Sequence, residues 1–446
     1  MKTAILLLFA FVSLIPSFGK PPAGIQSQLD AFVGTEPGGI AVAWVDADGV
    51  AFFSAGTFAS DDERLITPDT IFEIGSITKA FNGLLLAESV KAGKVKLEDS
   101  AAMYLLPSED PALTSTAKIT MRSLVTHYSG LPRLPFNIGS NPDGNPNPYA
   151  DYQREDLIAA FRQHGPTAPV GMTFAYSNYG AAVLGEALAA AWGKTYKEAL
   201  QAHILNPLGM TDTSLSLTGR TNPPGLAPGH SGGARAQNWH FQVFAPAGAL
   251  LSSTRDLATF LELALGYADS PLSESIVESN RPLETANTAD GGIGLGWLLA
   301  KHADHTTAWH NGGTGGYRSF LGFSRDSGKG IVVLTNRSTG VDNLGFGLLD
   351  TPAPRPQISR VDEASTYVGR YPLSPAFAID ITTNKEQLFL QATGQPRLAL
   401  REEAKDRFTV VGVPAEVSFE RDSTGAIDAL ILHQNGLDQR APREEL

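Results

Sequence analysis

Hydrophobic and polar positions follow two different periods in the first half of the chain. Between residues 38 and 58, two apolar runs of β type flank Asp46-Ala47-Asp48-Gly49, a combination that predicts a β-hairpin. After Ser76 the apolar positions follow helical spacing until Gly93, a typical helix stop. Helical composition also predicts a helix in the alanine-rich run from Tyr179 to Trp192. Ser76 is therefore expected in the first turn of a helix.

Strand-like runs return late in the chain. The segments IGLGWLLA, RSFLGFS and GIVVLTN lie between Ile293 and Asn336, with turn residues between them. Early and late strands around a helical middle predict an α+β fold over residues 20–350, with an antiparallel sheet flanked by helices and a helical subdomain inserted at about residues 80–240. The proline-rich segment TPAPRPQ predicts a linker at residues 351–359. Short β-type runs then predict a small all-β barrel or sandwich domain at residues 360–446.

The first twenty residues have the pattern of a secretory signal. A lysine precedes an apolar run from Ala4 to Ile15, and Pro16 and small residues follow it, which predicts a signal peptide at residues 1–19. The run is shorter than the roughly 20 residues that a bilayer-spanning helix needs, so we expect no membrane span after cleavage. No cysteine is present for a disulfide or a lipid anchor. We therefore expect a secreted protein, periplasmic in a Gram-negative cell.

The overall composition is that of a soluble globular protein, with 42% hydrophobic and 18% charged residues. The formal charge of −12 opposes contact with the phosphates of nucleic acid, and no basic stripe offsets it. We therefore expect no nucleic-acid partner.

Two local patterns suggest chemistry that their surroundings do not support. His302 and His305 have the spacing of some metal-ligand pairs, but no HExxH motif or acidic cluster accompanies them, and a solvated turn explains them better. Residues Gly229 to Gly233 satisfy the G-x-S-x-G pattern around Ser231, yet the prolines before them exclude the strand that a nucleophile elbow requires. We expect a flexible loop around Ser231, and neither a metal nor an organic cofactor.

Ser76 and Lys79 are three residues apart, which places them on one face of the expected helix. A serine hydroxyl is a good nucleophile only when a base takes its proton, and lysine can be that base only when burial or a nearby cation lowers its pKa. The start of a helix also offers backbone N–H groups to a developing oxyanion. The alternative is a helix cap followed by a surface lysine, because Ser-x-x-Lys often occurs by chance.

Two further segments favour the chemical interpretation. FAYSNYG supplies Tyr176, a phenolic proton carrier, and the amide of Asn178 just before the alanine-rich helix. WHNGGTGGY supplies His310 and a glycine-rich run ahead of a strand, where a substrate can approach the backbone closely. Taken singly, each segment is explained equally well as a loop or a turn.

Together, Ser76-x-x-Lys79, Tyr176-Ser177-Asn178 and His310-Asn311-Gly312 resemble, in order and spacing, the three motifs of the penicillin-recognising serine hydrolases. This family includes class C β-lactamases, D-Ala-D-Ala carboxypeptidases, D-aminopeptidases and related esterases. The segments ITMRSLVTHYSGLP, NPLGM and PAGALLSSTRDLATF also look like this family, so the resemblance covers about residues 30–340.

The resemblance implies a role for each matching residue. Ser76 would be the acylated nucleophile, Lys79 its activating partner and Tyr176 the proton carrier to the leaving nitrogen. Asn178 would hold the substrate amide. The oxyanion hole would consist of the backbone N–H groups of Ser76 and Gly313.

The third motif departs from typical class C β-lactamases. There it begins with lysine followed by threonine or serine, which help to hold the substrate carboxylate, whereas His310 and Asn311 stand here. A histidine is partly cationic at neutral pH, so we expect a weaker and pH-dependent carboxylate site. The function implied is a serine hydrolase that cleaves a β-lactam or a D-alanyl peptide. The alternatives are a carboxylesterase of the same fold and a non-catalytic module that binds cell-wall material.

Overall fold

The structure is a computed structural model of the chain. It describes residues 21–22, 24–138, 147–163, 165–283, 291–349, 364–374, 377–384, 387–393, 398–410, 415–434 and 437–444. The signal peptide expected at residues 1–19 and the linker expected at residues 351–359 lie outside the described residues.

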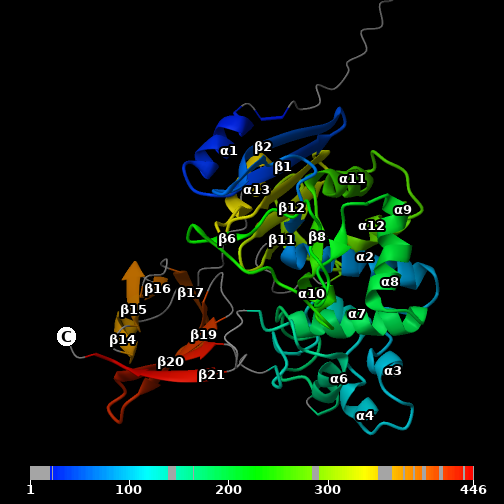
Figure 1. Ribbon diagram of the computed structural model, residues 1–446. Coiled ribbons are helices and arrows are strands. Elements are labelled where there is room, and N and C mark those ends of the chain that lie inside the picture. Colours follow the sequence, from blue (N-terminus) through cyan, green and yellow to red (C-terminus); the bar gives the residue numbers. More distant parts are fainter. Residues whose placement is uncertain are drawn as a thin grey trace, which may run out of the picture.

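The main sheet has eight antiparallel strands among the described residues (Figure 1). Their order is β3-β2-β1-β13-β12-β11-β10-β9, so the first strand pairs with the last one at the centre of the sheet. The predicted hairpin is confirmed, because Asp46 pairs with Gly49 across a tight turn. The strands are β1 Gly39–Asp46, β2 Gly49–Ala59, β3 Asp62–Leu65, β9 Gly291–Ile293, β10 Leu298–Lys301, β11 Thr306–Gly313, β12 Arg318–Ser324 and β13 Lys329–Thr335.

One strand prediction is wrong in detail. The segment IGLGWLLA forms parts of two antiparallel strands, β9 and β10, where the sequence predicted one. The Gly294 N–H donates to the Trp297 carbonyl at 2.9 Å, and Gly296 has a positive φ of 74°. These glycines close a turn inside an otherwise apolar run.

Helices cover both faces of the main sheet. The even-numbered residues of β1 from Ile40 to Trp44 share one core with α1 and α13, and the odd-numbered residues from Ala41 to Val45 share another with α2 and α11. Alternate residues enter different cores because side chains alternate along a strand. The helices on the sheet are α1 Ile25–Val33, α2 Thr78–Lys91, α11 Thr254–Leu265, α12 Ser273–Ser279 and α13 Asp342–Leu348.

The middle of the chain forms a helical region, which Figure 1 shows in cyan to green beside the sheet. Its longest helix is α7, and Ser177 caps it by accepting the Gly180 N–H at 2.8 Å. A Cβ on Gly185 of α7 would lie 2.1 Å from the Pro246 ring, so this glycine allows α10 to pack closely. The helices are α3 Ala102–Leu105, α4 Ala112–Thr116, α5 Met121–Val125, α6 Arg154–Gln163, α7 Asn178–Trp192, α8 Tyr196–Leu200, α9 Asn206–Leu208 and α10 Ala245–Gly248.

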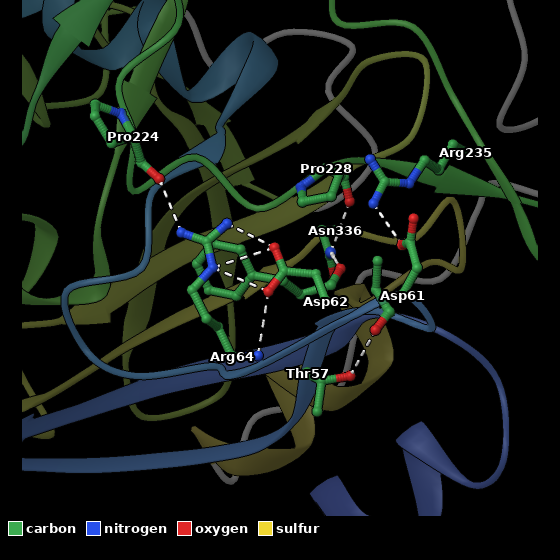
Figure 2. Close-up of polar contacts among 10 residues, drawn as sticks. Thr57, Asp61, Asp62, Arg64, Pro224, Pro228, Arg235 and Asn336 are labelled. Atoms are coloured by element: carbon green, nitrogen blue, oxygen red, sulfur yellow. Dashed lines mark hydrogen bonds and ion pairs between the residues drawn. The ribbon is translucent and has the colours of Figure 1, made fainter.

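Short strands and loops connect the helical region to the sheet. Figure 2 shows two of the contacts that hold residues 222–236 at the sheet edge: Arg64 donates to the Pro224 carbonyl at 3.2 Å, and Arg235 pairs with Asp61 at 2.5 Å. The short strands are β4 Phe72–Glu73, β5 Ser214–Leu215 and β8 Leu250–Ser252, which form one small sheet, and β6 His230–Ser231 and β7 Ala234–Arg235, which form another.

The C-terminal part forms a second sheet of eight strands, in which each strand pairs with the next (Figure 1). The Glu444 N–H donates to the Arg370 carbonyl at 2.8 Å, which brings the last strand beside the first and nearly closes a barrel. Its core is a separate cluster that includes Tyr371, Phe408 and Leu430. The strands are β14 Gly369–Ser374, β15 Phe377–Asn384, β16 Gln387–Ala392, β17 Leu398–Ala404, β18 Arg407–Val410, β19 Ala415–Arg421, β20 Ile427–Gln434 and β21 Leu437–Pro442.

The predicted fold class is therefore confirmed: an α+β region built on an antiparallel sheet, and a small β-barrel. The predicted domain boundaries near residues 350 and 360 stay predictions. Within the described ranges, no helix is both long enough and apolar enough to cross a membrane.

Candidate active site

Ser76 lies in a 3₁₀ turn, Gly75–Ile77, between β4 and α2. The turn leads directly into α2, so Ser76 lies just before the first α-helical turn, one step earlier than the sequence predicted. Gly75 has a positive φ of 51°, and a Cβ there would lie 2.7 Å from the backbone nitrogen of Gly313. Glycine is therefore required for the serine turn to lie against the end of β11.

Lys79 lies on the same side of the helix as Ser76, as the sequence predicted, and it is buried there. Its Nζ lies 3.1 Å from the Ser76 Oγ, 2.8 Å from the Asn178 Oδ1 and 2.6 Å from the Ala247 carbonyl oxygen. Burial, with a smaller contribution from the positive charge of Arg133, holds the pKa of Lys79 well below its ordinary value. No carboxylate is among these partners to restore the charged form.

Tyr176 lies against Lys79 and Ser76. The Lys79 Nζ is 4.8 Å from the centre of the Tyr176 ring, and the phenol interacts with the Ser76 hydroxyl. Burial raises the pKa of Tyr176 to about 12, although the Ser76 contact lowers it in part. The phenol therefore keeps its proton at neutral pH.

Asn178 connects Lys79 to the wall of the site. Its Oδ1 accepts from Lys79, and its Nδ2 donates to the Tyr149 hydroxyl at 2.9 Å. The Tyr149 ring is stacked on Phe241 with centres 5.3 Å apart, which holds this hydroxyl in place. The side-chain oxygen of Asn178 thus serves to orient the lysine.

His310 belongs to β11, which ends within the glycine-rich run at Gly313. The rest of the run lies ahead of β12, as the sequence predicted. Its Nδ1 lies 2.6 Å from the Asn311 carbonyl oxygen, which can only accept, so Nδ1 carries the proton. Burial, with a smaller contribution from Lys79 when its amine is protonated, lowers the pKa of His310 to about 3. The expectation of a partly cationic histidine is therefore wrong: the imidazole is neutral near pH 7.

Asn311 does not join the other predicted residues. Adjacent residues of a strand point to opposite faces, so Asn311 points to the face that α13 covers. There its Nδ2 donates to the Asp342 Oδ2 at 2.6 Å. Its side chain stabilises the sheet layer behind the site and is not directed at Ser76.

Sequence reasoning gave no role to several residues at the site. The His127 ring centre lies 4.5 Å from that of Tyr176, and its Nδ1 accepts the Ser177 N–H at 3.2 Å. Arg133 lies over the same tyrosine ring at 5.3 Å. The only sequence signal for them was the segment ITMRSLVTHYSGLP, which holds His127 and ends one residue before Arg133.

The alternative chemical patterns do not form catalytic sites. Ser231 is exposed in the β6 and β7 hairpin, which replaces the flexible loop that the sequence predicted. The rings of His302 and His305 stack with centres 4.5 Å apart. In the part of the chain that the structure describes, no three histidine, aspartate or glutamate side chains are grouped as metal ligands.

Two family models match the chain. A family model described as beta-lactamase matches residues 29–346, and one described as a domain of unknown function, DUF3471, matches residues 353–444.

Similar curated proteins include a penicillin-binding protein, a carboxypeptidase and a hydrolase. Penicillin-binding protein 4* of Bacillus subtilis is 25% identical over 425 residues, covering 87% of this chain and 91% of its own length. The D-alanyl-D-alanine-carboxypeptidase/endopeptidase AmpH of Escherichia coli is 25% identical over 342 residues, covering 72% and 85%. Unguisins hydrolase ungD' of Aspergillus campestris is 26% identical over 302 residues, covering 64% of this chain, but the chain spans only 56% of its length.

Solved structures share the fold. The crystal structure of SurE matches with a TM-score of 0.63 at 21% identity, over 94% of this chain and 98% of its own. A class C beta lactamase from Rhodobacter sphaeroides matches with a TM-score of 0.59 at 22% identity, over 70% and 93%.

Proposed function

The chain belongs to the beta-lactamase family of serine hydrolases, and on that basis we propose that Ser76 is its nucleophile, acylated by a β-lactam or by the amide bond of a D-alanyl peptide. Water then releases the acyl group. The names of penicillin-binding protein 4* and AmpH support this class of substrate.

The observation that carries the proposal is the set of three partners around the Lys79 amine. The oxygens of Asn178 and Ala247 can only accept, so they take both N–H bonds of a neutral amine. The nitrogen lone pair is then directed at the third partner, the Ser76 hydroxyl. A neutral Lys79 in this position is a general base for Ser76.

Acylation follows from this arrangement. Lys79 takes the Ser76 proton as Oγ bonds to the substrate carbonyl carbon, and the N–H groups of Ser76 and Gly313 stabilise the oxyanion. The carbon–nitrogen bond then breaks, and the leaving nitrogen takes a proton through Tyr176. Because Tyr176 is protonated at neutral pH, we assign the base role to Lys79 and the donor role to Tyr176.

Deacylation uses the same two groups. A water molecule attacks the ester carbon and gives its proton to the neutral Lys79. The Ser76 oxygen leaves as a hydroxyl with the proton of Tyr176, and Lys79 then returns a proton to Tyr176. The step needs no group beyond those already at the site.

A carboxylesterase is the second candidate, and the neutral His310 favours it, because this position offers no positive charge to a substrate carboxylate. The two candidates separate on substrates. Purified protein should be given nitrocefin, a D-Ala-D-Ala peptide and short p-nitrophenyl esters, and kcat/KM compared. Turnover restricted to the esters would refute the main proposal and leave the esterase.

The site assignment has its own test. Mass spectrometry after exposure to a β-lactam or a fluorophosphonate should find the adduct on Ser76. Ser76→Ala should abolish labelling, and Ser231→Ala is the matched control because it changes the exposed serine of the other pattern. Labelling of Ser231 that survives Ser76→Ala contradicts the assignment.

The proposed base role of Lys79 is tested by measuring both the acylation rate and the fold of a variant. Lys79→Ala should remove most acylation while circular dichroism stays that of the native protein. Acylation at the unchanged rate contradicts the base role.

We also propose that the protein is exported, on the pattern of residues 1–19. N-terminal sequencing after expression in a Gram-negative host should find a periplasmic protein that begins at Lys20. A cytoplasmic product that keeps Met1 contradicts export.

A further inference from the structure

A site for β-lactams or D-alanyl peptides needs a positive group near Ser76, because both substrates carry a carboxylate close to the bond that breaks. His310 is neutral and buried, so it does not supply that charge. Lys79 is buried as well, and its amine is occupied by Ser76, Asn178 and Ala247. The charge must come from another side chain.

Arg133 lies over the site from a neighbouring loop. Its guanidinium carbon is 5.3 Å from the centre of the Tyr176 ring, the ring that Lys79 also approaches. Its positive charge acts on Lys79, Tyr176 and Tyr149, which are all groups around Ser76. Arg133 is therefore close enough to act on the two proposed proton-transfer groups, Lys79 and Tyr176.

The backbone of Arg133 is held firmly. Its carbonyl oxygen accepts the N–H groups of Asn178 and Tyr179 at 3.0 and 3.1 Å, and the preceding carbonyl of Pro132 accepts from the Ser177 hydroxyl at 2.6 Å. These bonds join the loop to the start of α7, the same segment that carries Tyr176. The arginine thus has a fixed starting point relative to the reacting groups.

The guanidinium of Arg133 is accessible to a ligand. Arg133 is exposed, and within the described residues no carboxylate forms an ion pair with it. Arg318, which lies beside Gly313, differs because its guanidinium donates to the carbonyls of Thr314 and Tyr317 at 2.9 and 2.7 Å. An exposed arginine that no carboxylate of the described ranges neutralises, in a protein with a formal charge of −12, is well suited to an anionic ligand.

We propose that Arg133 is the specificity residue that recognises a carboxylate of the substrate, in place of a cation in the third motif. The inference rests on the proposed function, since it concerns the substrate that Ser76 attacks. A planar guanidinium can bind a carboxylate at its edge through two parallel hydrogen bonds while one of its faces stays on the Tyr176 ring.

The test uses two activated esters of similar size, p-nitrophenyl hydrogen succinate, which carries a carboxylate, and p-nitrophenyl butyrate, which does not. The wild-type protein should prefer the succinate ester in kcat/KM. Arg133→Gln should reduce that preference by about ten- to a hundredfold, the range for a hydrogen bond to a charged group, and Arg133→Lys should keep part of it. Arg122→Gln is the matched control, because Arg122 pairs with Glu98 away from the site.

A second measurement does not depend on turnover. Inhibition constants for phenylboronic acid and for 3-carboxyphenylboronic acid should differ in the wild-type protein, and the difference should shrink in Arg133→Gln. A purely structural role for Arg133, or an effect on Lys79 alone, would weaken the charged and neutral compounds equally.

The proposal is overturned if the wild-type protein shows no preference for the carboxylate, or if Arg133→Gln leaves the preference intact. Fluorophosphonate labelling of Ser76 is recorded for every variant. If Ser76 of the wild-type protein is labelled but the protein shows no preference for the carboxylate, only the role of Arg133 is rejected. If Ser76 of the wild-type protein is not labelled, the proposed function itself is rejected.

Discussion

Glu73 is a buried carboxyl three residues before the proposed nucleophile, and its ionisation should make stability depend on pH. Its Oε1 accepts from the Asn238 side chain at 2.8 Å and from the Trp239 N–H at 3.0 Å, and the Thr314 hydroxyl lies close to the carboxyl. Burial outweighs these contacts and raises the pKa of Glu73 from 4.5 to about 7.

The sign and size of the effect follow from this pKa. Between pH 4.5 and about 7 the folded protein holds a proton on Glu73 that the unfolded chain has released, so the free energy of unfolding falls as pH rises through this window. Each pKa unit corresponds to about 1.4 kcal/mol, so the full change is about 3 kcal/mol. Glu73→Gln keeps the acceptor oxygen and removes the titration.

Urea unfolding followed by tryptophan fluorescence measures this effect. All five tryptophans precede residue 350, so the signal reports unfolding of the part of the chain that contains Glu73. We compare the free energy of unfolding of Glu73→Gln with that of the wild-type protein at pH 4.5 and at pH 7.5. Relative to the wild-type protein, the variant should be about 3 kcal/mol more stable at pH 7.5 than it is at pH 4.5. Glu63→Gln, which changes an exposed glutamate of β3, is the control and should show no such change. A difference for Glu73→Gln that is the same at both pH values would refute the reasoning.

Three further predictions concern the site and its support. Tyr176→Phe should lower kcat/KM by about 10²–10⁴-fold, as expected for a lost proton carrier, and steady-state kinetics showing less than a tenfold fall would contradict that role. Gly75→Ala should lower both Ser76 acylation and thermal stability more than Gly93→Ala, because both glycines have a positive φ but a Cβ on Gly93 contacts nothing within 4 Å; equal losses would show that the approach to β11 is unimportant. Asn311→Ala should reduce the free energy of unfolding by about 1–3 kcal/mol, because Asp342 loses a buried donor, and an unchanged denaturation midpoint would argue against that contact.

Much of the fold follows from local pattern. The hairpin at Asp46 to Gly49, the helix after Ser76 and the alanine-rich helix ending at Trp192 all lie where their spacing predicted them. Turn residues and helical or alternating periodicity act over a few residues, so they can be recognised without knowing what packs against them. The split of IGLGWLLA was missed because its turn lies inside an apolar run and depends on backbone hydrogen bonds.

The reacting groups of the candidate site could be predicted from the sequence, but their protonation states and the residues around them could not. Ser76, Lys79 and Tyr176 could be chosen by chemistry and by the resemblance, and the structure places them together. Arg133 could not be chosen, because its relation to the Tyr176 ring depends on how a loop meets the start of α7.

The sequence by itself determined the order of strands and helices, the serine at the start of a helix, and the lysine one turn later on the same side. Tertiary structure alone decided that Lys79 and His310 are buried, that Asn311 turns away, and that Arg133 lies over the site. The physical reason is that local periodicity is a property of neighbouring residues, whereas a pKa depends on desolvation and on charges from distant parts of the chain.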